Sequence, residues 1–88
     1  MEKIVKSASA GTLESSDVYV EIEPNENDLD IQLESVVYNQ FGESIHRVIR
    51  EVLAECGVEK ASVRVSDRGA LECVIRARVE TAVLRGKE

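Results

Sequence analysis

The sequence predicts a small α+β domain in which two helices pack on one face of a mainly antiparallel sheet, with the element order β-β-β-α-β-α. Four short segments alternate apolar and polar residues, which is the pattern of half-buried strands. A longer segment after the third of them carries apolar residues at steps of three and four, the spacing of an amphipathic helix. A chain of 88 residues is sufficient for one domain, which we expect to span residues 1–88.

The first predicted strand, residues 3–13, has the weakest pattern. Its small side chains indicate either an edge strand or the close packing of another surface. Residues 18–23 alternate cleanly and place Val18, Val20 and Ile22 on one face. A turn-forming stretch follows, and residues 29–34 repeat the alternation, which is typical of two antiparallel strands with one solvent-facing side. Residues 61–66 form a short fourth strand in this prediction.

The first helix is predicted over residues 36–56. Ser35 is placed to cap its first amides, and Gly57 is placed to end it in the left-handed conformation. The segment from Ala70 to about Arg85 fits both a strand period and a helix period. Its length and its content of Ala, Leu, Glu and Arg favour a helix.

Composition limits the classes of function. A net charge of −6 argues against nucleic-acid binding, which requires clustered Lys and Arg. The sequence contains no apolar run near the roughly 20 residues that a membrane span requires, and its N-terminus lacks the apolar region of a signal peptide. The two cysteines, Cys56 and Cys73, match no metal or redox spacing, and we expect both to be reduced thiols in the core. These features indicate a cytoplasmic protein.

The sequence offers no catalytic constellation. A serine hydrolase needs a base and a group that orients the base, but the one histidine, His46, lies on the polar side of the predicted helix. Neither a Gly-x-Ser-x-Gly elbow nor a glycine-rich phosphate loop is present. The acidic stretch Asn25–Asp28 lacks the twelve-residue pattern of a calcium loop. We therefore expect neither catalytic residues nor a metal site.

Two further features have structural and functional interpretations. Glu34-Ser35-Val36 is superficially similar to the Asp-Ser-Leu signature of four-helix pantetheine carriers, but it follows a strand and its acid is Glu, so we interpret Ser35 as a helix cap. Basic residues gather near the C-terminus, where they either complement a helix dipole or dock an acidic partner. These residues are Arg76, Arg78, Arg85 and Lys87.

The stretch Ala10–Asp17 lies between the first two predicted strands and should be the exposed tip of a hairpin. Its residues are small, polar or acidic, and two adjacent hydroxyls, those of Ser15 and Ser16, stand at the turn. Serine is common in turns because its hydroxyl bonds nearby backbone groups. The pattern alone therefore permits either a plain turn or a point of covalent attachment.

The stretch Ala10-Gly11-Thr12-Leu13-Glu14-Ser15-Ser16-Asp17 strongly resembles the modification site of the acyl carrier proteins of citrate lyase, the gamma subunits. Further matches follow in the same order and spacing over nearly the whole chain. They are Asp30-Ile31-Gln32-Leu33-x-Ser35-Val36, Gln40-Phe41-Gly42 and Asp67-x-Gly69-Ala70-Leu71-x-Cys73-x-x-Arg76-Ala77-Arg78. The carrier of malonate decarboxylase is a more distant relative and looks less similar at the hairpin tip.

The resemblance implies a non-catalytic carrier. Ser15, which follows Leu13-Glu14, would bear 2'-(5''-triphosphoribosyl)-3'-dephospho-CoA through a phosphodiester, and Ser16 occupies a position that is often glycine in the family. Glu14 and Asp17 would then serve recognition by the phosphoribosyl-dephospho-CoA transferase that installs the arm. A citrate lyase ligase would acetylate the arm's thiol. The alpha subunit would exchange the acetyl thioester for a citryl thioester, releasing acetate, and the beta subunit would cleave it to oxaloacetate.

Two alternatives remain at this stage: a carrier for malonate decarboxylase, and an α+β interaction module with no prosthetic group. An adduct on the native protein separates a carrier from an interaction module. The enzyme complex that the protein reconstitutes separates the two kinds of carrier.

Overall fold

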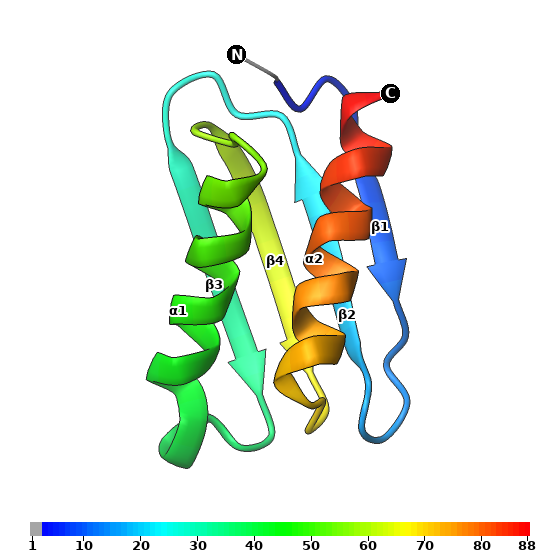
Figure 1. The fold of residues 1–88 in the computed structure, drawn as a ribbon, viewed down its shortest axis with the longest axis vertical. Coiled ribbons are helices and arrows are strands. Elements are labelled where there is room, and N and C mark those ends of the chain that lie inside the picture. The colour runs from blue at the N-terminus through cyan, green and yellow to red at the C-terminus, as the bar shows by residue number, and fades with distance from the viewer. Residues whose placement is uncertain (1–2) are drawn as a thin grey trace.

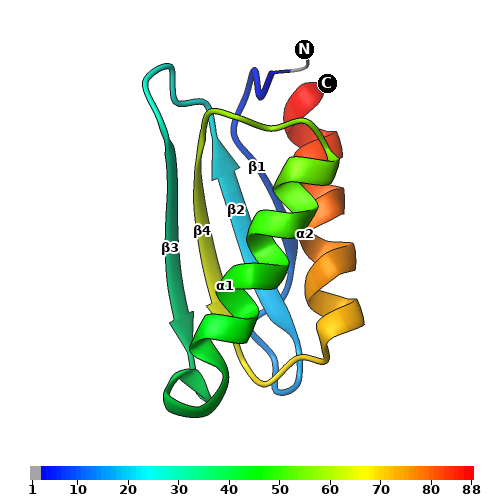
Figure 2. The same cartoon turned by 60° about the vertical axis from the view of Figure 1, so that its left-hand side comes forward.

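The computed structural model describes residues 3–88 and contains six elements. They are β1 (Ala8–Gly11), β2 (Val18–Glu23), β3 (Leu29–Ser35), α1 (Tyr38–Glu55), β4 (Ala61–Asp67) and α2 (Glu72–Lys87). Both helices cover the same face of a single sheet (Figure 1 and Figure 2). The predicted α+β class and element order are therefore confirmed. In this part of the chain, no helix is long and apolar enough to cross a membrane.

The sheet is mixed, with the strand order β1-β2-β4-β3. β2 pairs antiparallel with β1 and with β4, whereas β3 pairs parallel with β4. Although β2 and β3 follow each other in sequence, they are not neighbours, because β4 lies between them. A parallel pair needs a crossover connection, and α1 supplies it. Alternating side chains look the same in both kinds of pair, so the sequence pattern could not reveal this arrangement.

The core lies between the sheet and the two helices. α1 packs over β3 and against α2, and α2 packs over β1 and β2. Branched aliphatic side chains fill the space between these layers, as the scarcity of aromatic residues requires. The largest fully buried ones are Ile22, Ile49, Leu53, Val18, Val20, Val48, Val63, Val65, Val79 and Val83.

β1 is shorter than the predicted strand over residues 3–13. Before it, the amides of Val5 and Lys6 donate to the carbonyl oxygen of Gly86 at 2.9 and 3.3 Å, so they bond α2 instead of a strand. After it, Gly11 has a φ of 94°, which ends the extended conformation. β1 is an edge strand and α2 packs on it, so both interpretations of its small side chains hold.

α1 begins two residues later than predicted and ends at Glu55 instead of residue 56. Ser35 does not cap it, because Ser35 is still paired with Asp67 in the sheet; Val37 precedes the helix without a side-chain cap. At the other end Gly57 has a φ of 74°, its amide donates to Ala54, and the amide of Val58 donates to Leu53. This is a Schellman motif and confirms the role predicted for Gly57. The last segment is helical, as predicted.

Candidate functional site

The connection between β1 and β2 is a tight, exposed loop at one end of the sheet (Figure 1). Gly11 enters it with a positive φ, and a Cβ atom there would lie 1.8 Å from the carbonyl oxygen of Val18. Only glycine fits this position. Residues 12–16 are exposed, and Ser15 lies at the turn. The predicted hairpin tip is therefore present, and we call residues 12–17 the tip.

Asp17 holds the tip together. Its carboxylate accepts hydrogen bonds from the Thr12 hydroxyl at 2.6 Å and from the Val18 amide at 2.8 Å. Arg78 on α2 donates to the same carboxylate through Nε at 3.3 Å and Nη2 at 3.1 Å. This charge-assisted, two-pronged contact joins residues 61 positions apart and fixes the tip to the helical layer.

Backbone hydrogen bonds fix the tip from a second side. The Ser16 amide donates to the carbonyl oxygen of Arg68 at 2.8 Å, and the Arg68 amide donates to that of Asp17 at 2.9 Å. Within the tip, the Asp17 amide donates to Glu14 at 3.1 Å. The loop between β4 and α2, which contains Arg68, therefore acts as a buttress for the residues around Ser15.

These contacts lower the pKa of Asp17 from its ordinary value of 3.8 to about 2. The hydrogen bond from Thr12 is the largest cause, followed by the Val18 amide and then by Arg78, while partial desolvation opposes them. The carboxylate is thus ionised over the whole physiological range. Its role in the structure is to hold the tip, which the sequence interpretation of Asp17 as a recognition residue did not include.

Ser15 and Ser16 differ in backbone and in contacts. Ser16 has a φ of 67°, in the left-handed region that favours glycine, and its amide is bonded to the buttress. The hydroxyl of Ser15 is exposed and has no hydrogen-bond partner within residues 3–88. Both hydroxyls are exposed and make no hydrogen bond within residues 3–88, so the two serines differ in backbone conformation and not in the availability of the hydroxyl.

Ser35 is a structural residue. Its hydroxyl donates to Oδ2 of Asp67 at 2.8 Å and accepts a hydrogen bond from the Val37 amide at 3.1 Å. Asp67 is only 2% exposed, and its Oδ1 accepts from the Ala70 amide at 2.9 Å. Ser35 thus joins the end of β3 to the end of β4. Its hydroxyl is occupied, although by a different contact from the predicted helix cap.

The four basic residues near the C-terminus all contact other parts of the chain. Arg76 pairs with Glu51 and Glu72, and these carboxylates, Glu51 first, raise its pKa. Arg85 donates to the Ser9 carbonyl oxygen at 2.8 Å and Lys87 to that of Cys56 at 2.7 Å. Arg78 pairs with Asp17, so each of the four side chains has a contact within the protein. The interpretation of these residues as a docking patch for an acidic partner did not anticipate these contacts. The dipole interpretation applies to the last turn of α2, where Arg85 and Lys87 lie.

The prediction of two core thiols is wrong for Cys73, which is exposed. The buried face of α2 is set by residues 75, 79, 82, 83 and 86, and position 73 lies outside that stripe. Cys56 is half-buried at the end of α1 and packs against the core. His46 is also half-buried, with its ring edge-to-face to Tyr38 at 6.5 Å between centroids.

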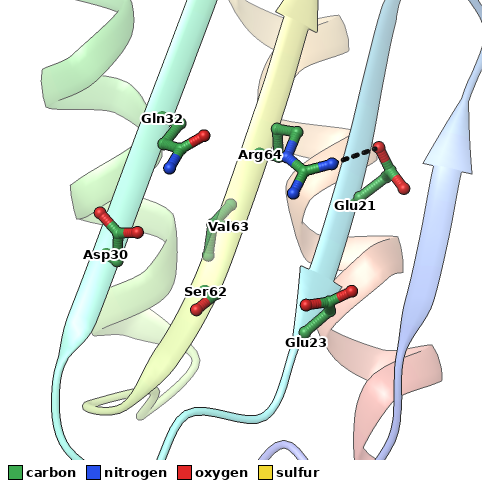
Figure 3. A pocket seen from close by; sticks show the side chains of 7 residues that line it. All are labelled: Glu21, Glu23, Asp30, Gln32, Ser62, Val63 and Arg64. Atoms are coloured by element: carbon green, nitrogen blue, oxygen red, sulfur yellow. Dashed lines mark ion pairs between the residues drawn. The ribbon is translucent and has the colours of Figure 1, made fainter.

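The uncovered face of the sheet carries a polar hollow of about 120 Å³ (Figure 3). Its lining comes from β2, β3 and β4, and Arg64 pairs with Glu21 across it at 3.8 Å. Small-molecule sites usually enclose about 300 Å³ or more. Residues 3–88 also contain no cluster of three His, Cys, Asp or Glu side chains arranged to hold a metal ion. Neither this hollow nor a metal cluster therefore supplies a candidate site in the described part of the chain.

Sequence reasoning selected Ser15 as the candidate residue and did not anticipate the contacts of Arg78 and Asp67 at the same end of the molecule. Nothing in the local pattern pairs Arg78 with Asp17, because the contact forms only when α2 packs over β1 and β2. Asp67 looked like an ordinary turn residue. One signal was available in the sequence. Asp67 follows the alternating apolar residues Ala61, Val63 and Val65 at the next position that faces inward.

Comparisons with known proteins cover nearly the whole chain. The family model described as the malonate decarboxylase delta subunit (MdcD) matches residues 5–86. The citrate lyase acyl carrier protein of Escherichia fergusonii is 58% identical over 87 residues, covering 98% of this chain and 90% of the relative. That of Haemophilus influenzae strain PittEE is 54% identical over 86 residues, covering 98% of this chain and 90% of the relative.

Among solved structures, a Pseudomonas malonate decarboxylase hetero-tetramer in complex with malonate contains a chain of the same fold. Its TM-score is 0.82 at 22% sequence identity, covering 96% of this chain and 87% of that one. This likeness shows the fold alone. Because the full-length relatives are more than half identical and carry one name, the chain belongs to the family of citrate lyase acyl carrier proteins.

Proposed function

We propose that this protein is the acyl carrier subunit of a citrate lyase complex and that Ser15 bears a phosphoribosyl-dephospho-CoA prosthetic group through a phosphodiester, formed from the precursor 2'-(5''-triphosphoribosyl)-3'-dephospho-CoA. The observation that carries the proposal is the exposed, unbonded Ser15 hydroxyl on a loop held by Asp17, Arg78 and Arg68. A hydroxyl in this state is free to form an ester without breaking any contact that the fold needs. Ser35 fails the same test, because its hydroxyl is already bonded to Asp67. Ser16 passes it, and the order Leu13-Glu14-Ser15 is the reason for proposing Ser15.

The residues around Ser15 fit covalent attachment. In the esterification, the Ser15 oxygen forms a bond to phosphorus, the hydroxyl proton passes to a base of the modifying transferase, and pyrophosphate leaves. Glu14 and Asp17 keep the tip polar and hydrated, and Asp17 is occupied by its own hydrogen bonds. The attached group supplies a thiol for acyl transfer; the chain supplies a fixed point from which that thiol reaches other subunits.

The partners under this proposal are the alpha and beta subunits of citrate lyase, the phosphoribosyl-dephospho-CoA transferase and the citrate lyase ligase. The carrier presents acetyl and citryl thioesters, and the chemistry of citrate cleavage belongs to the other subunits. Acetylation of the arm consumes ATP, which supports placing the protein in the cytoplasm.

The test is to express the protein together with the arm-synthesising enzymes and to map the adduct by peptide mass spectrometry. The wild type should carry one adduct on Ser15. Ser15→Ala should carry none and should support no citrate cleavage when mixed with the partner subunits, while Ser16→Ala, the matched control, should be loaded. An adduct that persists on Ser15→Ala, or full cleavage without any adduct, would reject the proposal.

A second candidate is the carrier subunit of a malonate decarboxylase. It is favoured by the family model that matches residues 5–86 and by the fold of the Pseudomonas chain. Loaded protein should be mixed in parallel with citrate lyase subunits and with malonate decarboxylase subunits. Reconstitution of malonate decarboxylation, and not of citrate cleavage, would select this second candidate.

A further inference from the structure

An apolar groove of about 330 Å³ separates the beginnings of α1 and α2. Val37, Phe41 and Ile45 line it on one side, and Ala70, Leu71 and Ile75 on the other. Phe41, the one phenylalanine of the chain, is 53% exposed and Leu71 is 71% exposed. Covering large apolar side chains of this kind with a partner lowers the free energy, because their surface is removed from water. The isolated chain therefore leaves apolar surface of this groove exposed to solvent.

Exposed apolar side chains concentrate at the end of the molecule that carries Ser15. Seven large hydrophobic residues are exposed within residues 3–88. Figure 1 shows that β2 begins, β3 ends and both helices start at the end of the sheet that carries the tip. Five of the seven residues belong to these segments: Leu13 in the tip, Val36 after β3, Tyr38 and Phe41 at the start of α1, and Leu71 before α2. The other two, Val5 before β1 and Leu84 near the end of α2, belong to segments at the other end of these elements. This uneven distribution marks one end as the contact end.

The groove and the tip are parts of one rigid unit. Arg68 is bonded to the backbone of both Ser16 and Asp17, and the next residues, Gly69 to Leu71, line the groove. The position of Ser15 relative to the groove is therefore fixed before any partner arrives. A partner that binds the groove finds the Ser15 hydroxyl at one defined place.

We propose that this groove is the docking site of the enzyme that esterifies Ser15; the inference rests on the function proposed above. That enzyme must hold the reacting phosphorus about 3–3.5 Å from the Ser15 oxygen, so its surface must surround the tip and cover the neighbouring groove. The groove accepts an apolar side chain from the modifying enzyme, with Phe41 and Leu71 as the principal contacts.

The charges at this end define the rest of the partner surface. The carboxylates of Glu14 and Glu43 enter no ion pair in the described chain, whereas Arg68 is the single such base near the tip. The partner surface should therefore present Lys or Arg around its apolar anchor. Raising the salt concentration should slow association by screening these charges.

The experiment uses the unmodified protein, the phosphoribosyl-dephospho-CoA transferase and the triphosphate arm precursor. Phe41→Ser and Leu71→Ser are compared with Leu84→Ser, whose side chain is 56% exposed on α2 away from the tip. Intact mass gives the rate of arm transfer, and fluorescence anisotropy gives the Kd for the transferase. Each groove variant should raise KM and Kd about ten-fold or more with kcat little changed, as loss of an apolar anchor does. Leu84→Ser should stay within about two-fold.

The outcomes separate this inference from the proposed function. If wild type is loaded and both groove variants keep its KM, the groove proposal is wrong and Ser15 remains the attachment site. If wild type receives no adduct, both proposals fail. Two other outcomes, each with an unchanged KM for the transferase, would also overturn the proposal. If sedimentation shows a dimer that the groove variants disrupt, the groove binds a second copy of the chain. If the groove variants lose only citrate cleavage, the groove binds another subunit of the complex. Thermal unfolding identifies any variant that does not fold, and Phe41→Leu then replaces Phe41→Ser with an expected smaller rise in KM.

Discussion

Two serines at the same end of this molecule, Ser15 and Ser35, have opposite environments. Each has an aspartate close by that accepts several hydrogen bonds. At the tip, Asp17 bonds Thr12, Val18 and Arg78 and leaves the Ser15 hydroxyl free. At the junction of β3 and α1, Asp67 bonds the Ser35 hydroxyl itself and is buried.

The difference shows what makes a serine available for modification. Exposure of the loop is one requirement, and the other is that a different residue satisfies the hydrogen-bonding needs of the loop. Asp17 meets the second requirement for Ser15, so the hydroxyl has no structural duty. Ser35 performs that duty itself and loses its availability. Sequence alone shows a serine beside an acid in both places.

The largest expected effect is that of Asp67→Ala. Both the Ser35 hydroxyl and the Ala70 amide would lose their acceptor in a buried setting, which costs about 2–4 kcal/mol of unfolding free energy. Urea unfolding measures it, and Asp30→Ala, on the exposed face of β3, is the control with an expected change within about 0.5 kcal/mol. A cost for Asp67→Ala as small as that of the control would contradict the structural role assigned to this junction.

Asp17→Asn tests the other aspartate through pH. Because the pKa of Asp17 is lower in the folded state than its ordinary 3.8, its contribution to stability is full above about pH 4 and disappears as pH falls through about 2. Asp17→Asn should be less stable than wild type at pH 7, and the difference should shrink across this window. Other carboxylates titrate in both proteins and cancel in the comparison. A difference independent of pH would show that the ionised clamp does not stabilise the fold.

Exchanging the two serines for alanine should separate stability from loading. Ser35→Ala removes two hydrogen bonds and should cost about 1 kcal/mol while leaving arm transfer to Ser15 intact. Ser15→Ala should change stability by no more than about 0.5 kcal/mol and abolish arm transfer. Urea unfolding and intact mass on the same samples give both quantities. Loading lost in Ser35→Ala, with the fold intact, would break the distinction between the two sites.

Ser16→Gly should stabilise the protein slightly. Ser16 has a φ of 67°, where a Cβ atom is unfavourable, so glycine should gain about 0.5–1 kcal/mol. Ser16→Ala keeps the Cβ atom and should show no such gain. Both variants should still be loaded on Ser15. A loss of stability in Ser16→Gly, measured by thermal unfolding, would mean that the Ser16 side chain contributes to the tip.

The smallest expected effect is a difference in the labelling rates of the two cysteines, which involves no change in stability. Cys73 is exposed and should react with a maleimide quickly in native buffer, whereas half-buried Cys56 should react more slowly. Peptide mass spectrometry at successive times distinguishes the two thiols. Equal labelling rates in the folded protein would show that the exposure of a side chain does not predict its reactivity here. That result would also weaken the argument that the exposed Ser15 hydroxyl can be modified.

Much of the fold was predictable because its signals are local. The alternation of Val18, Val20 and Ile22 and the Gly57 helix end are properties of short segments, and the structure has both as predicted. The pairing of β3 with β4 was not predictable, because strand order depends on how α1 crosses the sheet. The start of α1 was missed for a related reason: Ser35 stays in the sheet through a contact with Asp67, 32 residues away.

The sequence by itself determined the α+β class, the element order, the hairpin that carries Ser15 and the choice of Ser15 as the residue to test. The tertiary structure decided which side chains are free to act. Arg78 meets Asp17 and Arg76 meets Glu51 only once α2 has packed over the sheet. The same packing decides which face of α2 is buried and leaves Cys73 exposed. The physical reason is that periodicity and turn chemistry act within a few residues, whereas occupied and unoccupied hydrogen-bonding groups result from contacts between distant segments.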